Sequence, residues 1–225
     1  MRMKRKPNLA ARIERCSHLL INEPALHSGR WLDDFGFGEL RVELGCGKGR
    51  FSVETARAEP DVLFVALEKS DNVLVIALER TAAAGLNNLL FVNVLADDLL
   101  DFFAPGEISQ IYINFCDPWP SNRHAKRRLT GPRFLELYSQ VLSRQGCLHF
   151  KTDNLPLFEF SLREFGRNGF FLLDVVRDLH KNGPVGVMTD YELKFYSQGT
   201  PIFKCIAGAV RNAAPALLSR LFHVW

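Results

Sequence analysis

The sequence predicts an α/β fold built on one doubly wound, mostly parallel sheet with an antiparallel edge strand. Two observations favour this fold. Apolar, β-branched runs of strand length alternate with helical segments along most of the 225 residues, which is typical of parallel β-α-β units. The last two predicted strands have little helix between them, and strands joined in that way pair antiparallel at the edge of a sheet.

In the first half of the chain, caps and breakers set the bounds of each element. Asn8 is a potential N-cap for the first helix, and the turn at Gly36-Phe37-Gly38 follows the second. Pro60 interrupts the helix after the first strand, and Gly85 stops the helix after the second strand. The predicted elements are, in order, a helix over 9–20, a helix over 28–35, a strand over 40–44, a helix over 50–59, a strand over 62–67, a helix over 71–84, a strand over 89–94 and a short helix over 97–103.

In the second half, apolar runs mark the strands. Residues 108–115 are apolar and β-branched and predict a buried strand. Pro132 lies early in the next helix, where proline is tolerated, and Asn182-Gly183-Pro184 predicts a loop over 178–190. The remaining elements are, in order, a helix over 132–143, a strand over 146–151, a helix over 155–168, a strand over 170–176, a helix over 191–197 and a strand over 201–210.

We divide the chain into one domain, residues 31–210, and two flanking segments. Residues 1–30 comprise a basic N-terminal tail and a short helix, and residues 211–225 form a C-terminal tail. No repeat, linker or low-complexity stretch indicates a second domain. The C-terminal tail carries apolar residues that are candidates for docking on the core, namely Leu217, Leu218, Leu221 and Phe222.

The composition is that of an ordinary globular protein, with 47% hydrophobic residues and a net charge of +3. The five cysteines are widely spaced and contain no CxxC pair, so we expect neither a disulfide framework nor a metal site, and a reducing compartment. No apolar run resembles a signal peptide or approaches the length of a membrane span. We therefore expect a cytoplasmic protein, a monomer or homodimer, with no membrane partner.

Positive charge is concentrated in two segments of this nearly neutral chain. The N-terminal segment contains Arg2, Lys4, Arg5, Lys6, Arg12 and Arg15. The second segment contains Arg123, Lys126, Arg127, Arg128 and Arg133. Such local patches indicate an anionic polymer bound on one face. The alternative is a solvated charged face without a partner.

The second basic segment directly follows the stretch Phe115-Cys116-Asp117-Pro118-Trp119-Pro120. Each proline ends any strand pairing and restricts the residue before it, so Asp117 and Trp119 are held rigidly at the carboxyl end of a strand. In open α/β sheets that edge is where ligands bind. A rigid acid and an aromatic ring beside a basic run indicate a nucleobase pocket next to a phosphate track. The alternative is a proline-rich turn beside a solvated face.

A glycine-rich turn joins the first strand to the following helix and indicates a nucleotide-type cofactor. Its glycines are Gly45, Gly47 and Gly49, and Arg50 stands where a dinucleotide-binding turn has its third glycine. Glu43, just before the turn, repels a pyrophosphate but suits a ligand with an ammonium and a sulfonium. This pattern favours S-adenosylmethionine over NAD.

Other acids extend this predicted cofactor site. Glu68 ends the second strand, and an ionised carboxylate there accepts both ribose hydroxyls. The adenine is expected after the third strand, with the Leu95 backbone beside the ring and Asp97 accepting from the exocyclic amine. The alternative for Glu43 is an ion pair with Arg41 or Lys48.

The chain resembles the bacterial tRNA (guanine-N7)-methyltransferases from about residue 31 to about residue 206. The resemblance is carried by Asp117-Pro118-Trp119-Pro120, the basic run from Arg123 to Thr130, Thr152-Asp153, and Thr189-Asp190-Tyr191-Glu192. It implies a Rossmann-like S-adenosylmethionine-dependent methyltransferase fold over residues 31–210. It also implies methyl transfer to N7 of a guanosine in the variable loop of tRNA.

The resemblance also implies roles for individual residues. Asp117 is the expected catalytic acid and, with Glu43 and Glu68, a cofactor contact. The expected substrate and RNA contacts are Ser121, Arg123, His124, Lys126, Arg127, Arg128, Asp153, Thr189, Asp190, Tyr191 and Glu192. Three positions depart from the family pattern: Ser121 replaces a usual lysine, Leu95 replaces an acid or amide and keeps only a backbone contact, and Cys116 replaces a proline or serine.

This residue set suits the chemistry of guanine N7, whose in-plane lone pair carries no proton. Transfer to that nitrogen needs no general base, but it needs alignment and stabilisation of positive charge on the base. Two alternatives stay open at this point. One is an exocyclic-amine N-methyltransferase acting on nucleic acid, and the other is a non-catalytic tRNA-binding module. A nicotinamide oxidoreductase is disfavoured by Glu43 and Arg50.

Overall fold

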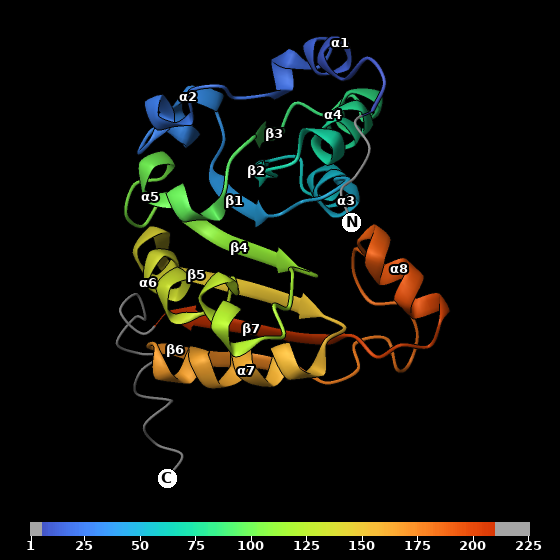
Figure 1. The fold of residues 1–225 in the computed structure, drawn as a ribbon. Coiled ribbons are helices and arrows are strands. Elements are labelled where there is room, and N and C mark those ends of the chain that lie inside the picture. Colours follow the sequence, from blue (N-terminus) through green and yellow to red (C-terminus); the bar gives the residue numbers. More distant parts are fainter. Residues whose placement is uncertain (1–5, 210–225) are drawn as a thin grey trace.

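The computed structural model describes residues 6–209, which form a seven-stranded sheet with the order β3-β2-β1-β4-β5-β7-β6 (Figure 1). The strands are β1 (Glu39–Leu44), β2 (Val62–Leu67), β3 (Leu89–Val92), β4 (Ile108–Asn114), β5 (Leu142–Thr152), β6 (Phe170–Val176) and β7 (Phe203–Ala209). Strands β1 to β5 pair in parallel, and β7 pairs antiparallel with both β5 and β6. The predicted α/β fold class is confirmed.

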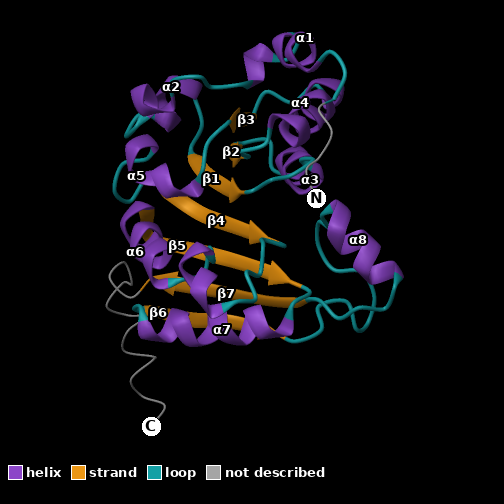
Figure 2. Cartoon of the chain, in the orientation of Figure 1, coloured by secondary structure: helices purple, strands orange, loops and turns teal. Residues whose placement is uncertain are grey.

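Helices cover both faces of this sheet (Figure 2). They are α1 (Leu9–Glu14), α2 (Trp31–Phe35), α3 (Arg50–Ala58), α4 (Asp71–Ala84), α5 (Leu99–Phe102), α6 (Pro132–Val141), α7 (Leu155–Arg167) and α8 (Asp190–Ser197). Short 3₁₀ turns lie at Ser17–Leu19, Pro24–His27, Ala96–Asp98 and Asn122–Arg127. Over residues 6–209, no helix has both the length and the apolar character needed to cross a membrane.

Alternation along the strands divides the buried side chains into two cores. In β2, Leu63 and Val65 face the core that also holds Trp31, whereas Phe64 points into the core shared with α3 and α4. Because successive side chains of a strand point to opposite faces, a fully buried strand needs apolar residues at every position. All six residues of β2 are buried, as expected for a strand inside a doubly wound sheet.

The N-terminal segment departs from the predicted helix over residues 9–20. Helix α1 ends at Glu14, and Asn8 has a φ of 53° and no capping hydrogen bond from its side chain. Leu20 instead forms a parallel bridge with Phe91 of β3, and the Ile21 amide donates to the Phe91 carbonyl at 2.9 Å. Pairing with the sheet edge thus replaces the last helical turns and joins residues 9–21 to the core.

The antiparallel edge is confirmed, and β7 lies between β5 and β6 rather than outside them. The inner place suits β7 because Cys205 and Ala207 are small and fully buried. Strand β6 instead exposes Leu173 and Val175 at 49% and 41%, as an edge strand can. Residues 210–225, including the C-terminal apolar set, lie outside the described residues.

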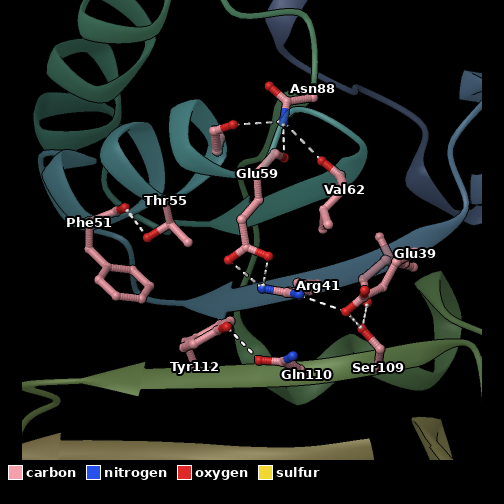
Figure 3. A network of polar contacts seen from close by, with 12 residues as sticks. Glu39, Arg41, Phe51, Thr55, Glu59, Val62, Asn88, Ser109, Gln110 and Tyr112 are labelled. Atoms are coloured by element: carbon pink, nitrogen blue, oxygen red, sulfur yellow. Dashed lines mark hydrogen bonds and ion pairs between the residues drawn. The ribbon is translucent and has the colours of Figure 1, made fainter. Parts of the chain in front are cut away.

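Hydrogen bonds and ion pairs connect the amino ends of the central strands to the neighbouring loops (Figure 3). Arg41 of β1 donates to Glu39 at 2.6 Å and to Glu59 at 2.7 Å. The Asn88 amide donates to three backbone carbonyls, of Ala56, Glu59 and Val62, each at 3.0 Å. Arg41 is therefore engaged at the end of the sheet opposite the predicted site, which argues against its pairing with Glu43.

Burial of His149 in β5 predicts how the free energy of unfolding depends on pH. Its ring stacks on Tyr112 with centroids 4.8 Å apart, and burial, assisted by Lys204 and Arg41, lowers the pKa of His149 to about 4. The unfolded chain takes up this proton near pH 6.5, so this stability is complete above that pH and falls as the pH drops toward 4. We expect the free energy of unfolding to fall by up to about 3 kcal/mol over this pH range.

The measurement is urea unfolding at pH 7 and pH 4.5. We expect His149→Phe, which keeps an aromatic ring against Tyr112, to lose less stability than the wild type between these two pH values. Equal losses in both proteins would contradict the assignment.

Candidate active site

The acids predicted for the site lie at the carboxyl ends of five adjacent strands. Glu43 is near the end of β1, Glu68 directly follows β2, and Asp97 lies in the turn after β3. Asp117 follows β4, and Asp153 directly follows β5. Because these strands are parallel and neighbours in the order β3-β2-β1-β4-β5, their carboxyl ends share one edge, where the connections reverse direction at β1 and β4. Ligands bind at such a switch point.

The glycine-rich turn after β1 is held by backbone hydrogen bonds and by Glu68. The amides of Gly45 and Cys46 donate to the Leu67 carbonyl at 2.8 and 3.0 Å. The Gly47 amide donates to Glu68 at 3.1 Å. Gly45 and Gly47 have φ values of 75° and 59°, and no atom lies within 4 Å of a Cβ built at either. The turn therefore presents a backbone that a ligand can approach closely.

Gly49 differs from the other two glycines in its packing, and its expected contact with the cofactor stays a prediction. A Cβ built on it lies 2.6 Å from Ala77 Cβ and 3.0 Å from Ala77 Cα. Gly49 is buried between α3 and α4, so its missing side chain permits helix packing.

This packing predicts that Gly49→Ala destabilises the protein. The φ of 74° and the clash with Ala77 act together, and we expect a loss of about 2–4 kcal/mol in the free energy of unfolding. Gly85→Ala is the matched control, because Gly85 has a φ of 65° but no atom within 4 Å of the new Cβ. Urea unfolding of both variants gives the comparison, and equal losses would contradict the packing role.

Glu43 lies beneath the glycine turn and is 1% exposed. The Ser52 hydroxyl donates to one carboxylate oxygen, and the Asn114 amide donates to the other at 2.9 Å. Burial raises the pKa of Glu43. The carbonyl oxygen of Asn114 is itself buried and has no hydrogen-bond partner. Two buried side-chain acceptors thus meet where β1 and β4 end, and an unpartnered one marks a place for a donor.

The predicted adenine region after β3 is more open. Leu95 is 49% exposed, and Asp97 is half-buried and pairs with Arg133 of α6 at 2.6 Å. The side chain of Asn93 donates to Asp71 at the start of α4. The adenine contacts expected of the Leu95 backbone and of Asp97 stay a prediction.

The loop after β4 is strained and strongly held. Phe115 and Trp119 have φ values of 54° and 42°, which are unusual for residues other than glycine. Arg128 donates to the Trp119 carbonyl at 2.9 Å and to the Pro118 carbonyl at 3.2 Å. Such strain persists only where surrounding contacts fix the backbone, and it is common at functional sites. The loop presents Asp117 as an exposed residue at the sheet edge.

The basic run divides into exposed residues and one buried residue. Arg123 and Lys126 are exposed, whereas Arg128 is 8% exposed and stacks on Phe160 with its guanidinium carbon 4.3 Å from the ring centroid. The donors of Arg128 are directed at the loop carbonyls, and the expected contact of Arg128 with RNA stays a prediction.

Trp119 is also engaged within the protein. Its ring lies under the Arg127 guanidinium, 4.8 Å from the centroid, and stacks on His124 with centroids 5.7 Å apart. Arg123 donates to Nε2 of His124 at 2.9 Å. Ser121, which precedes this turn, is exposed.

Thr189 and Glu192 form the N-terminal cap of α8. The Glu192 amide donates to the Thr189 hydroxyl at 2.9 Å, and the Thr189 amide donates to the Glu192 carboxylate at 3.2 Å. Glu192 is fully buried and pairs with Lys151 Nζ at 2.7 Å and with His180 Nε2 at 2.9 Å. The Glu192 carboxylate is thus occupied by protein donors, and its expected contact with the guanosine stays a prediction.

The other two residues of this motif face different surroundings. Asp190 pairs with Arg80 of α4 at 2.6 Å. Tyr191 is 62% exposed and stacks on Phe195, which in turn stacks on Phe115. Tyr191 therefore offers an exposed aromatic face, supported from beneath, next to the loop that holds Asp117.

Burial disfavours the thiolate form of the two cysteines near this edge. Burial raises the pKa of Cys116 to about 12 and also raises the pKa of Cys46 well above its usual value. The thiolate is the reactive form of cysteine, and all five thiols are free.

Sequence reasoning missed four residues of this edge: Asn114, Lys151, His180 and Arg80. Asn114 and Lys151 had a signal, because each lies at the end of a predicted strand beside a named motif. Arg80 had none, since it lies 110 residues from Asp190 and no pattern joins them.

Comparisons with known proteins match this chain to methyltransferases. A family model described as "Putative methyltransferase" matches residues 38–205. The chain is 45% identical over 209 residues to the tRNA (guanine-N(7)-)-methyltransferase of Geobacillus kaustophilus, covering 92% of this chain and 96% of that protein. The protein of the same name from Halalkalibacterium halodurans is 44% identical over 209 residues, covering 92% of this chain and 95% of that protein.

Solved structures support the fold alone. The crystal structure of the 16S rRNA methyltransferase KamB matches with a TM-score of 0.62 and 16% identity, covering 79% of this chain and 92% of that chain. An antibiotic-related methyltransferase matches with a TM-score of 0.61 and 15% identity, covering 81% and 94%.

Proposed function

We propose that this chain, which belongs to the tRNA (guanine-N7)-methyltransferase family, transfers a methyl group from S-adenosylmethionine to N7 of a guanosine in the variable loop of tRNA. The observation that carries the proposal is the shared edge where Glu43, Glu68 and Asp117 end adjacent strands. The proposal includes a cytoplasmic location, a domain over residues 31–210, and a monomer or homodimer.

The residues of the edge fit S-adenosylmethionine. The unpartnered Asn114 oxygen is a buried acceptor suited to an ammonium group, and the Glu43 carboxylate that Asn114 binds orients this amide. The open backbone at Gly45 and Gly47 leaves room for the ligand chain. Glu68 retains acceptor capacity for ribose hydroxyls, because an ionised carboxylate accepts about four hydrogen bonds and two are made here.

Bound S-adenosylmethionine supplies an activated methyl group, and the chain supplies position and charge. The Asp117 carboxylate stabilises the positive charge that develops on the purine as N7 is methylated. Asp153, half-buried at the end of β5, accepts from the N1–H and N2–H donors of the guanine edge. Because N7 carries no proton, no residue needs to act as a base.

The paired guanosine must leave its stack to reach this edge, at a cost of a few kcal/mol. Tyr191 is the proposed stacking partner, at about 1–3 kcal/mol, because Trp119 is already covered by Arg127 and His124. Thr189 and Glu192 orient α8. They therefore affect the guanine only indirectly, by positioning Tyr191 and Asp190.

The test compares three tRNA transcripts of one sequence as methyl acceptors. We expect transfer to the guanosine transcript and no transfer when 7-deazaguanosine replaces guanosine, because that base lacks N7. Inosine keeps N7 but lacks the exocyclic amine, so an inosine transcript stays a substrate. Methylation of the 7-deaza transcript with loss of the inosine reaction would favour the exocyclic-amine alternative.

The basic run predicts two distinct mutant phenotypes. Replacing the exposed Lys126 and the ring-covering Arg127 with alanine is expected to reduce the salt dependence of tRNA affinity, by about one in the log–log slope for each phosphate that is no longer neutralised. Arg128→Ala is expected to keep the slope and to lower turnover, because it frees the loop that holds Asp117. Filter binding at several salt concentrations checks this, and a flattened slope in Arg128→Ala alone would contradict it.

A further inference from the structure

Arg80 touches both halves of the proposed site. It lies on α4, and its Nη1 donates to the Lys48 carbonyl at 3.0 Å and to Asp190 at 2.6 Å. Its Nη2 donates to the second carboxylate oxygen of Asp190 at 3.3 Å. Lys48 belongs to the glycine turn after β1, and Asp190 is the first residue of α8. One guanidinium thus joins the cofactor turn to the helix that carries Tyr191.

Helix α4 gives Arg80 a fixed base. Ala77, one turn earlier on α4, is the residue against which Gly49 packs. Residues three apart lie on the same face of a helix, so the face that positions Gly49 also directs Arg80 toward Lys48. The beginning of α3, the glycine turn and α4 therefore form one packed unit.

Helix α8 has a second anchor on the other side of the site. Glu192 is fully buried against Lys151 of β5 and His180. The N-terminal turn of α8 is thus attached to α4 through Asp190 and to β5 through Glu192, and Figure 1 shows α8 beside the carboxyl ends of β4 and β5. A change at either anchor changes where Tyr191 points.

We propose that Arg80 is a positioning residue that couples cofactor binding to tRNA binding. This inference rests on the proposed function. A ligand bound to the glycine turn restrains the Lys48 carbonyl further, and Arg80 then holds Asp190 and α8 in the orientation that receives the base. Coupling between two sites is reciprocal, so tRNA bound against α8 tightens the cofactor site by the same factor.

Stability alone does not explain this arrangement. The side chains of Arg80 and Asp190 are 37% and 32% exposed, and ion pairs at such exposure contribute little to folding. A comparable ion pair lies on the same helix: Arg12 binds the Glu79 carboxylate through a bidentate pair of hydrogen bonds at 2.7 and 2.6 Å. That pair holds α1 and contacts neither the glycine turn nor α8.

The experiment measures the dissociation constant of S-adenosylhomocysteine by calorimetry, without and with saturating unmodified tRNA. For the wild type we expect tRNA to tighten this binding about fivefold or more. Arg80→Met is expected to bring the ratio near one while thermal stability stays close to that of the wild type. Asp190→Asn is the second variant, and it is expected to reduce the ratio with the Lys48 contact intact. Glu79→Gln is the control and keeps the wild-type ratio.

The outcomes separate the two proposals. A wild type that does not bind S-adenosylhomocysteine contradicts the proposed function itself. A wild type that binds both ligands independently, or an Arg80→Met variant that keeps the full ratio, overturns the coupling role. If Arg80→Met fails to fold, Asp190→Asn decides in the same way.

Discussion

Asp117→Asn is expected to lower the single-turnover rate of methyl transfer about 100-fold or more while S-adenosylhomocysteine binding stays nearly unchanged. The substitution keeps the shape of the side chain and removes its charge. Groups that stabilise charge only as it develops typically contribute about 100-fold to 1000-fold in rate. The loss of rate should be large because Arg128 holds the strained loop in place. The loop therefore cannot rearrange to bring another carboxylate to the position of Asp117.

The control for this variant is Asp61→Asn. Asp61 is also exposed, but it precedes β2 and so lies at the amino end of the sheet. We expect its rate to match the wild type. Single-turnover measurement with excess enzyme isolates the chemical step, and a near-wild-type rate for Asp117→Asn would remove Asp117 from the catalytic role.

Lys151→Met is expected to destabilise the protein by about 3–5 kcal/mol, because it leaves the buried Glu192 carboxylate without its cation. His180 does not compensate fully. Its Nδ1 accepts from the Val185 amide at 3.2 Å, so only Nε2 faces the carboxylate, and it offers one hydrogen bond there. We also expect the KM for tRNA to rise, since α8 loses its attachment to β5.

Lys204→Met provides a closely matched control. Lys204 is the cross-strand neighbour of Lys151 in the β5–β7 pairing, and it pairs with Asp174, whose side chain is 41% exposed. A partly exposed pair contributes up to about 1 kcal/mol. Urea unfolding compares the two variants. Equal losses in the free energy of unfolding would mean that the contacts of Glu192 with Lys151 and His180 do not anchor α8.

The positions of the acids at the sheet edge were predictable from the sequence. Strand β2 is entirely apolar, and β1, β4 and β5 each contain a shorter apolar stretch that is followed within a few residues by glycine, proline or an acid, so the strand ends can be read from that change. The carboxyl ends of parallel strands share an edge, which places Glu43, Glu68 and Asp117 there without knowledge of tertiary contacts. The glycine turn was found for the same reason, since it directly follows the first strand.

The protein contacts of Gly49, Arg128 and Glu192 were not predictable, because each depends on a partner that the local pattern does not contain. Gly49 resembles Gly45 in sequence and differs only through its packing on Ala77 of another helix. Arg128 belongs to a basic run whose other members are more exposed. Lys151, the partner of Glu192, lies 41 residues away in the sequence. Burial of the Glu192 carboxylate could not be predicted without knowing that this lysine lies beside it.

We infer that the acids of one sheet edge present a methyl donor to the bare ring nitrogen of guanine. The most direct measurement is transfer of a labelled methyl group from S-adenosylmethionine to unmodified tRNA, followed by nuclease digestion and identification of the labelled nucleoside by mass spectrometry. We expect the label to be recovered as N7-methylguanosine from a single position in the variable loop. Recovery of the label on an exocyclic amine, or no transfer by an enzyme that binds both ligands, would contradict this mechanism.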